Sequence, residues 1–527
     1  MVAERNNRIL PVGIQSFEVI RNNGYLYVDK TDVIWQLANR GKKYNYLSRP
    51  RRFGKSVLVD TLQTYFEGKK ELFEGLKIMD LEDEWVHHPV IRLDMSIAGA
   101  NSDTIRGYLA DAFKEYEEAY GLGTIEKSVP LAVRLQNIIK AAYDQTGQQV
   151  VVLIDEYDSP LQHSWKTLQH EACTEVYREV FAVLKKQDKY ERFVFITGIT
   201  KFTQISIFSV LNNLSNISFD APYAALCGIT KEEIEENFFP EIAQMGAQNG
   251  WTMEETIEQL KRYYDGYHFC RTNMVDVFNP FSVINALADK ELRNYWAASG
   301  ATSLLPKFVN DLDIRIQELD NCAILASVIE TSDVTGGGSE LFLYQSGYLT
   351  IKDYISGTYI LGIPNHEVRQ ALNEIVLPSL AMRKNNDLQS TQAFLNLYMN
   401  TANLPEAKKC LKALIADVPY SNKKLASMDM EERYRLLIST IFNAIGCQVQ
   451  VERMLATGRI DMVVATLHYI YVMELKLTKN GGLAAAEKQI FENHYTEPFK
   501  ADKRKVIALA IELDDMGKGL VDWKVVE

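Results

Sequence analysis

The first two hundred residues alternate between short apolar runs and longer amphipathic stretches. The apolar runs are rich in β-branched and aromatic residues, which is typical of buried strands, and they lie at residues 44–47, 90–95, 150–154 and 192–196. Amphipathic stretches with helical spacing lie at 104–120, 131–143 and 174–186. Strands that alternate with helices predict a parallel sheet between two helical layers, which is an α/β fold.

This alternation stops near Gly228, and residues 228–300 are predicted to be mostly helical. Thr230 followed by Glu233 has the spacing of a capping box, and the proline after Asn279 is typical of a helix start. We interpret the region as a helical lid. Its aromatic stretch at 263–269 indicates core packing rather than base stacking, because Tyr and Phe usually fill cores.

Residues 301–385 combine helical stretches with two alternating segments, 349–354 and 358–363. Because residues 355–357 contain Ser-Gly, these two segments predict a β-hairpin. Helices followed by a hairpin suggest a winged-helix-like module, a fold that serves both DNA and protein contacts. Residues 386–425 are interpreted as a helical connector.

The last hundred residues, 426–527, predict a smaller α/β domain. In this domain the predicted strands follow one another closely. Another strand-like apolar run, Tyr25 to Val28, lies much earlier in the chain. An amphipathic helix at 428–444 precedes strand-like segments at 449–455, 458–465 and 469–477. The last two segments predict neighbouring strands of a hairpin.

Three charged residues of this hairpin carry candidate chemistry. Asp461 lies on its first strand, and Glu474 and Lys476 lie on its second strand. Glu474 and Lys476 project to the same face because side chains alternate along a strand. Two carboxylates and a lysine can bind Mg²⁺ or Mn²⁺, activate water and stabilise a phosphate under attack. The combination predicts phosphodiester cleavage, with Asp461 and Glu474 as metal ligands.

A second candidate site follows the first apolar run, where Gly54, Lys55 and Ser56 open a helical pattern. Strand, loop and helix in this order suit a phosphate-binding loop. The glycine permits a close approach, the helix N–H groups and Lys55 attract phosphate, and Ser56 offers a hydroxyl to Mg²⁺. The first glycine of the usual pattern is replaced by Arg49. The loop alone therefore leaves an ordinary turn as an alternative.

Asp155 and Glu156 directly follow the apolar run at 150–154. Carboxylates at the C-terminal end of a central parallel strand lie where open α/β sheets bind their ligands. In an NTPase the first would hold Mg²⁺ and the second would polarise the attacking water. Together with Lys55 and Ser56, this pair favours an ATPase over a solvated acidic turn.

Three segments resemble the bacterial AAA-ATPase-like family, whose members commonly carry a C-terminal domain of the PD-(D/E)XK nuclease type. They are RPRRFGKS at 49–56, LIDEYDSPL at 153–161 and ITGITKFTQISIFSVLNNL at 196–214. The resemblance covers nearly the whole chain and implies an AAA-type P-loop ATPase core at 1–227. In that family an arginine stands where Arg49 is, so the missing glycine agrees with the resemblance.

The resemblance implies ATP and Mg²⁺ as cofactors of the first domain. The predicted nucleotide-binding residues are Arg49, Arg51, Arg52, Phe53, Gly54, Lys55, Ser56, Asp155 and Thr197, with Ser56 and Asp155 at the metal and Glu156 catalytic. Thr197 is expected beside the nucleotide strand, where it would sense the γ-phosphate. Thr200 and Lys201 are alternatives, and any of the three could instead cap the next element.

The three hairpin residues match the signature positions of the PD-(D/E)XK core, which implies a restriction-endonuclease-like fold for 426–527. Glu432 matches the catalytic carboxylate that the first helix often supplies, with the adjacent Glu431 as an alternative. Gln489 matches the polar catalytic residue of the following helix, and Tyr495 a nearby tyrosine of the family.

Composition and charge narrow the classes of protein that fit. The chain has 527 residues, enough for two to four domains, and its formal net charge of −12 argues against a protein that coats nucleic acid non-specifically. Its six cysteines form no C-x-x-C pair, which favours reduced core thiols over zinc. No apolar run is long enough to span a membrane. We expect a cytoplasmic protein without a membrane partner, and leave a homo-oligomer open.

The sequence predicts an ATPase coupled to metal-dependent cleavage of nucleic acid, with DNA preferred to RNA on the resemblance alone. One alternative is an ATPase switch or signalling protein whose nuclease-like domain binds nucleic acid or partners without cutting. Another is an interaction protein with a degenerate nucleotide loop, which predicts that ATP does not stabilise the fold.

Overall fold

The structure is a computed structural model that describes residues 9–123, 125–126, 128–200, 214–272, 275–301, 316–331, 338–380, 385–416, 429–466 and 468–526. The chain forms two compact units. The first unit is Met1–Tyr295 with Leu319–Asn365, and the second is Trp296–Glu318 with His366–Glu527. The predicted domain boundaries at 227, 300, 385 and 425 stay predictions. Lys201 lies outside the described residues.

A five-stranded parallel sheet forms the centre of the first unit, which confirms the predicted α/β fold. In spatial order its strands are β2 (Val90–Asp94), β3 (Val150–Asp155), β4 (Glu191–Gly198), β1 (Tyr44–Ser48) and β5 (Ser215–Asn216). Residues 150–155 are all buried, as expected of a central strand covered on both faces. The predicted strand at Tyr25 to Val28 is wrong, because only Tyr25 pairs, in an isolated bridge with Ile9.

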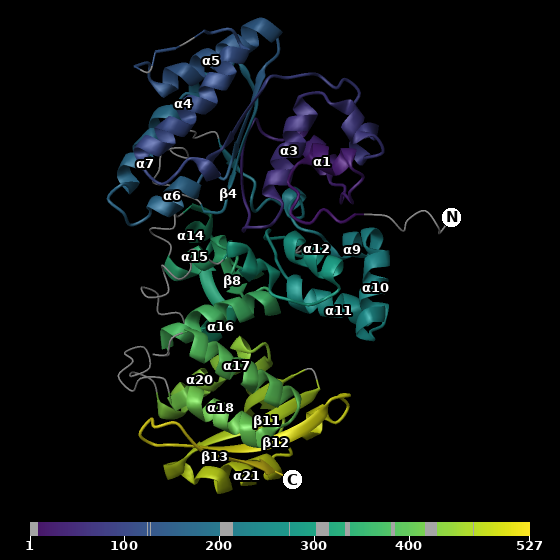
Figure 1. The fold of residues 1–527 in the computed structure, drawn as a ribbon, viewed down its shortest axis with the longest axis vertical. Helices are drawn as coiled ribbons and strands as arrows, with labels where there is room; N and C mark the ends of the chain where they lie inside the picture. The colour runs from purple at the N-terminus through teal and green to yellow at the C-terminus, as the bar shows by residue number, and fades with distance from the viewer. Residues whose placement is uncertain are drawn as a thin grey trace. The chain divides into compact units, whose positions relative to one another are not determined.

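Helices cover both faces of this sheet (Figure 1). The first unit begins with α1 (Phe17–Asn22), α2 (Thr31–Arg40), α3 (Lys55–Phe66), α4 (Ser102–Ala119), α5 (Leu131–Thr146), α6 (Ser159–Ser164) and α7 (His170–Phe181). Helices α4, α5 and α7 lie on one side of the sheet and α1 and α3 on the other. The main core forms where α4 and α5 bury Phe113 and Ile138 against Val152.

A helical group follows the sheet, as predicted for the lid region. It comprises α9 (Lys231–Asn237), α10 (Phe239–Asn249), α11 (Met253–Tyr264) and α12 (Pro280–Asp289). The predicted capping box is confirmed, because Thr230 and Glu233 exchange both side-chain to backbone bonds. Asn279 caps α12 as expected.

A small antiparallel sheet completes the first unit. Its spatial order is β6 (Cys322–Leu325), β8 (Thr358–Gly362) and β7 (Thr350–Ile355), with α14 (Ala326–Thr331) and α15 (Gly338–Gln345) beside it in sequence. The predicted hairpin is confirmed in β7 and β8. Ser356 and Gly357 join these strands with φ angles of 47° and 85°, the left-handed pair that a two-residue type I′ turn requires.

The second unit contains a mixed five-stranded sheet of β13 (Leu520–Val526), β12 (Lys505–Leu513), β11 (Tyr469–Leu477), β10 (Gly458–Ala465) and β9 (Gln448–Leu455). Its helices are α16 (His366–Leu380), α17 (Asn385–Asn400), α18 (Leu404–Ala416), α20 (Met430–Ala444) and α21 (Gly482–Glu492). Helices α18 and α20 cover one face of the sheet and α21 the other (Figure 1). Only β11 and β12 are parallel.

A buried acid in the first unit makes its stability depend on pH. Glu191 is fully buried and accepts a 2.6 Å hydrogen bond from the Tyr44 hydroxyl, and burial raises its pKa from 4.5 to about 7. Between those two pH values the folded state keeps a proton that the unfolded state has released, so stability falls as pH rises.

The free energy of unfolding of the wild type should therefore fall by on the order of 3 kcal/mol between pH 5 and 8, and this fall should be absent in Glu191→Gln. Thermal melts across this range check it. Asp188→Asn removes a neighbouring exposed acid and should leave the wild-type fall in place. If the melting temperatures of the wild type and of Glu191→Gln rise together from pH 5 to 8, the assignment of the pH dependence to Glu191 is contradicted.

Candidate functional site

The phosphate-loop candidate connects β1 to the start of α3. Gly54 precedes the helix with φ 83°, a left-handed conformation that favours glycine, and no side chain caps the helix. The first N–H groups of α3 are therefore open toward a ligand, and the helix dipole favours an anion there. Local structure thus matches the predicted phosphate-binding loop.

The structure brings the predicted Lys55, Ser56, Asp155 and Glu156 together. Lys55 is 4% exposed, and its Nζ donates to the carbonyl oxygens of Arg49 and Pro50 at 3.1 Å and lies 4.0 Å from Glu156 Oε1. Ser56 is hydrogen-bonded to Asp155, whose pKa is raised to about 6, chiefly by burial. A lysine, a hydroxyl and two carboxylates at one sheet edge suit a nucleotide with its magnesium ion.

Arg49 has a different environment from the other loop residues. Its guanidinium donates to the carbonyl oxygens of Ser48, Ser218 and Tyr223 at 2.8–3.0 Å and stacks on Phe269 at 4.1 Å. The side chain is 1% exposed, and its backbone φ is not positive. This position therefore needs no glycine, and the geometry suits a residue that holds the loop in place.

Of the remaining loop residues, Phe53 is buried and Arg52 is exposed. Phe53 is 1% exposed and packs edge-on against Tyr267 and Phe269, with ring centroids 4.7 and 5.4 Å away. Tyr267 and Phe269 of the aromatic stretch at 263–269 thus serve in packing, as the sequence indicated, and their partner is the loop residue Phe53. Arg52 stacks over Phe281 at 5.0 Å, and Arg51 lies 3.5 Å from the Gln162 side-chain oxygen.

Thr197 lies beside the nucleotide strand, opposite Leu47 in the register of β4 and β1. Its buried hydroxyl donates to the Leu47 carbonyl at 2.9 Å. The alternative Thr200 donates instead to Asp158, which also accepts from the Ile199 and Thr200 backbone. Asp158 is a buried polar residue of the LIDEYDSPL motif that the sequence reasoning passed over.

We expect Thr197→Val to change the ATP turnover rate by no more than about threefold. The reason is that its hydroxyl is engaged in the sheet, so its loss should cost stability by about 1 kcal/mol. Phosphate release and thermal melting measure the two effects. A hundredfold loss of turnover at unchanged melting temperature would instead support the γ-phosphate-sensing role.

The second candidate site lies on β10 and β11, where the predicted Asp461, Glu474 and Lys476 meet. Met462 pairs with Met473, so Asp461 and Glu474 stand on adjacent strands. Lys476 Nζ lies 2.8 Å from Glu474 Oε1 and 4.0 Å from Asp461 Oδ2. Asp461 and Glu474 are 4% and 0% exposed.

Burial and neighbouring charges shift the pKa values of Glu474 and Lys476. Burial, and next the charge of Asp461, raises the pKa of Glu474 above its usual value. Burial alone would lower the pKa of Lys476, but its hydrogen bond to Glu474 and the two carboxylates raise it. Lys476 is therefore held as an ammonium, and a second cation beside the carboxylates would be favourable.

Of the two adjacent acids on α20, Glu431, the alternative to the predicted Glu432, is the one that lies toward this site. Glu432 is exposed, whereas Glu431 is 19% exposed, lies 3.7 Å from Arg435 and accepts from Asn480 at 3.4 Å. The i to i+4 spacing on α20 puts Arg435 on the same helix face as Glu431.

Gln489 and Tyr495 contact each other near this site. The Gln489 side-chain amide donates to the Tyr495 hydroxyl at 3.1 Å, and that hydroxyl donates to the Arg459 carbonyl at 2.8 Å. Both residues therefore fix the start of β10, two residues before Asp461. The roles of all these site residues stay predictions.

Two charged residues of this site, Arg435 and Glu452, were not predicted from the sequence. Arg435 lies 3.5 Å from Asp461 Oδ1 and 2.6 Å from Glu452 Oε1, and Glu452 also contacts Arg459 at 2.8 Å. The spacing of Glu431 and Arg435 was a usable signal, but it is common on exposed helices.

The carboxylates of this site are the candidate ligands for a metal ion. Across the described ranges, no three His, Cys, Asp and Glu side chains form a metal-binding group. Asp461 and Glu474 nevertheless present two buried carboxylates that repel each other, and carboxylate oxygens are the ligands that Mg²⁺ and Mn²⁺ prefer. These two residues fit a divalent ion completed by water or substrate oxygens.

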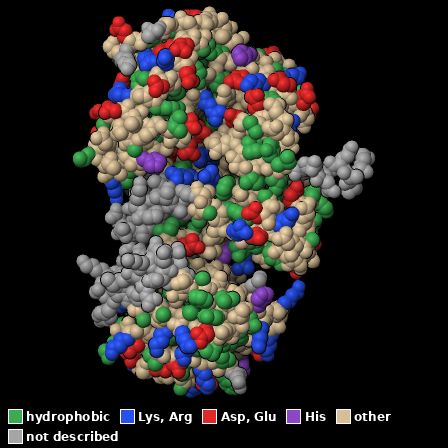
Figure 2. All heavy atoms as spheres, in the orientation of Figure 1, with side chains coloured by type: hydrophobic (Ala, Val, Ile, Leu, Met, Phe, Trp, Pro, Cys, Tyr) green, Lys and Arg blue, Asp and Glu red, His purple; other side chains and the backbone are tan. Residues whose placement is uncertain are grey.

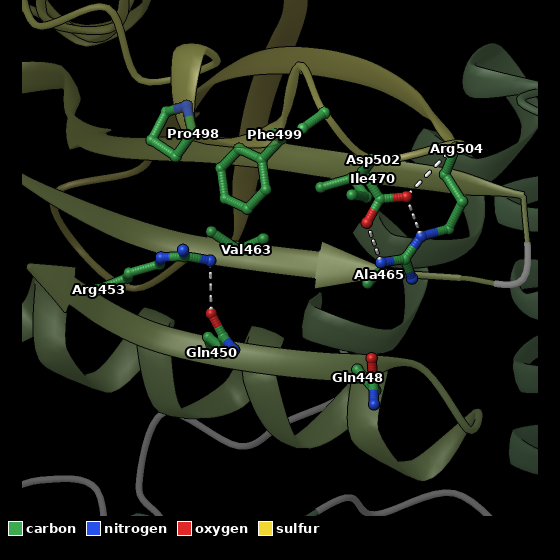
Figure 3. A pocket seen from close by; sticks show the side chains of 11 residues that line it. Gln448, Gln450, Arg453, Val463, Ala465, Ile470, Pro498, Phe499, Asp502 and Arg504 are labelled. Carbon is green, nitrogen blue, oxygen red and sulfur yellow. Dashed lines mark hydrogen bonds and ion pairs between the residues drawn. The ribbon is translucent and has the colours of Figure 1, made fainter. Parts of the chain in front are cut away.

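A hollow of about 400 Å³ lies elsewhere on the second unit (Figure 3). Arg453 stacks on Phe499 at 4.7 Å within it, and Arg504 bonds Asp502. Ile470 lines it on the β11 face that also carries Glu474, roughly 13 Å further along the strand. None of the predicted site residues line this hollow.

Charged side chains of both signs are interspersed over the visible surface (Figure 2). This face carries no large field of one sign, which is the feature that non-specific coating of nucleic acid requires. No described helix is both long and apolar enough to cross a membrane.

Two family models match the two candidate sites. A predicted AAA-ATPase family model matches residues 11–208, and a PD-(D/E)XK nuclease superfamily model matches residues 429–523. Proteins of these two classes usually use a nucleotide and a divalent metal ion. The chain is therefore an AAA-ATPase-like protein with a C-terminal nuclease-superfamily domain, as the sequence resemblance implied.

A relative that aligns with nearly the whole of this chain shows the family to which the chain belongs. It is the uncharacterized protein in the vnfD 5′ region of Azotobacter chroococcum mcd 1, 30% identical over 98% of this chain and 98% of its own length. The chain belongs to the family of that protein.

Two solved structures are similar at 12% identity. Cdc6p from Pyrobaculum aerophilum has a TM-score of 0.23, with 67% of this chain and 97% of its own chain covered. The Aeropyrum pernix ORC2 protein has a TM-score of 0.24, with 71% and 96% covered. The fold assignment rests on sheet topology and the family models.

Proposed function

We propose that this protein binds and hydrolyses ATP in its first unit and cleaves DNA with a divalent metal ion in its second unit. The observation that carries the proposal is the buried group of Asp461, Glu474 and Lys476 on adjacent strands. Such a group has little structural reason to exist, because two carboxylates this close repel each other.

In the second unit each of these residues has a separate role. Asp461 and Glu474 would hold the metal ion, which supplies a water of lowered pKa and neutralises phosphate charge. Lys476, held charged by Glu474, would stabilise the negative charge that builds on the phosphate. The water oxygen bonds to phosphorus, one ester P–O bond breaks, and the water proton ends on the released hydroxyl.

In the first unit the roles follow the order of the loop and the acidic strand. Lys55 and the N–H groups of α3 would bind phosphate oxygens, while Ser56 and Asp155 would hold magnesium. Glu156, 4.0 Å from Lys55, would orient the attacking water. Arg49 and Phe53 would hold the loop against Tyr223 and Phe269.

Cleavage assays on the full chain test the proposal. Linear, circular and single-stranded DNA, and RNA of the same sequence, are incubated with Mg²⁺ or Mn²⁺, with and without ATP. We expect metal-dependent DNA products that EDTA removes and a cleavage rate that ATP changes. ATP turnover without any cleavage would contradict the nuclease proposal and favour the ATPase switch.

A further inference from the structure

One arginine lies among the carboxylates of the cleavage site. Arg435, on α20, has a side chain that is only 12% exposed. Its Nη2 lies 3.5 Å from Asp461 Oδ1 and 3.7 Å from Glu431 Oε1, and its Nη1 donates to Glu452 at 2.6 Å. The guanidinium is therefore fixed between three acids that come from three different elements.

The strand register explains why a cation is needed at this place. Ile460 pairs with Arg453 and Met462 with Val451, so Glu452 of β9 lies across from Asp461 of β10. Like charges that face each other across neighbouring strands destabilise a sheet. Arg435 contacts both carboxylates and so offsets their repulsion.

The backbone also indicates that this arrangement is held under strain. Glu452 has φ 54°, a left-handed conformation that costs a non-glycine residue on the order of 1 kcal/mol. In this conformation its carboxylate contacts both Arg435 and Arg459. Such strain persists where the surroundings impose it, and such positions cluster at functional sites.

We propose that Arg435 supplies the positive charge that a second metal ion would otherwise bring to the cleavage site, so that the site binds a single divalent metal ion beside Lys476. This inference rests on the proposed function of the second unit. Two-metal phosphodiesterases place a second ion about 3.5–4 Å from the first, where both ions clamp the phosphate. Here Asp461 Oδ1 faces the guanidinium, while Asp461 Oδ2 accepts from the Leu475 N–H and faces Lys476.

The chemistry of a guanidinium suits this task. It stays charged at all relevant pH values and offers paired donors that match the oxygens of a phosphate. Asp461 and Glu474 would hold the metal ion, and Arg435 would bind a phosphate oxygen from the Glu431 side. Arg435 is then a catalytic residue that the nuclease signature does not contain.

The test counts Mn²⁺ ions bound to the full chain without nucleotide or DNA, by calorimetry and by electron paramagnetic resonance of free Mn²⁺. Ions that Asp461→Asn loses are assigned to the cleavage site. We expect one such ion in the wild type and two in Arg435→Gln, which frees the place between Asp461 and Glu431. The matched control, Arg459→Gln, removes an arginine that also contacts Glu452 and should keep one ion.

Cleavage by Arg435→Gln should fall by roughly 10²-fold, the scale of losing one preorganised charge. Two ions in the wild type, or one in a folded Arg435→Gln, would overturn the inference. If melting shows that Arg435→Gln is unfolded, Arg435→Lys keeps the charge and must keep one ion. No Mn²⁺ sensitive to Asp461→Asn would overturn the proposed function as well. If the ion counts are as expected but no DNA is cleaved, the proposed nuclease function is contradicted, whereas the assignment of Arg435 is retained.

Discussion

Replacement of Asp461 with asparagine is expected to abolish DNA cleavage and leave ATP turnover unchanged. The substitution removes one of two carboxylates that fit the metal ion, so we expect a loss on the order of 10³-fold or more. Asparagine can still accept the hydrogen bond that the Leu475 N–H donates to Asp461 at 2.9 Å, so the second unit should stay folded. DNA cleavage and phosphate release, measured on the same preparation, check both halves of the prediction.

The control for this experiment is Glu487→Gln. Glu487 lies on α21 of the same unit and forms a surface ion pair with Lys524 at 2.8 Å. It removes an acid of similar size outside the cleavage site, so the cleavage rate should stay at the wild-type level. Cutting by Asp461→Asn at the wild-type rate would place the nuclease activity elsewhere in the chain.

Replacement of Lys55 with alanine is expected to weaken ATP binding roughly 10- to 100-fold, which is the loss of one charge-assisted contact. In the wild type, ATP at a hundred times its dissociation constant should stabilise the fold by about 2.7 kcal/mol, because it binds only the folded state. The variant should lose this stabilisation at the same ATP concentration, together with ATP turnover. Thermal melting with increasing ATP measures the effect.

Lys43→Ala is the matched control for Lys55→Ala. Lys43 directly precedes β1, at the opposite end of the strand from the loop, and pairs with Asp188 at 2.9 Å on the surface. Its loss should leave the ATP-dependent melting shift intact. A full shift in Lys55→Ala would contradict the loop assignment, and an absent shift in the wild type would favour an interaction protein with a degenerate loop.

Much of the fold could be predicted because its strands are buried in continuous or alternating runs. The predicted segments 458–465 and 469–477 coincide with β10 and β11. The strand predicted near Tyr25 failed because a strand also needs a partner along its whole length, and composition does not supply one. Helix α1 escaped prediction because it is only six residues long, with its start capped by Ser16.

The candidate sites were predictable where chemistry follows from spacing along one motif. Asp461 and Glu474 belong to adjacent strands of a hairpin, so their proximity could be read from the chain. The place of Arg435 depends on how α20 packs against β9, and no local pattern encodes that packing. The choice between Glu431 and Glu432 likewise depends on the rotation of α20, which one residue changes by about 100°.

The interleaving of the two units has a consequence for how such a protein is inherited. Residues 296–318 belong to the second unit although they precede 319–365 of the first, so the chain passes between the units three times. Within the second unit, Trp296 is fully buried and its backbone N–H donates to the Glu367 carboxylate at 2.8 Å. A single recombination junction cannot transfer this unit whole, because a gene fragment that begins at residue 366 lacks Trp296. The ATPase-like and nuclease-like parts are therefore expected to descend together, as in the Azotobacter relative that aligns over 98% of both chains.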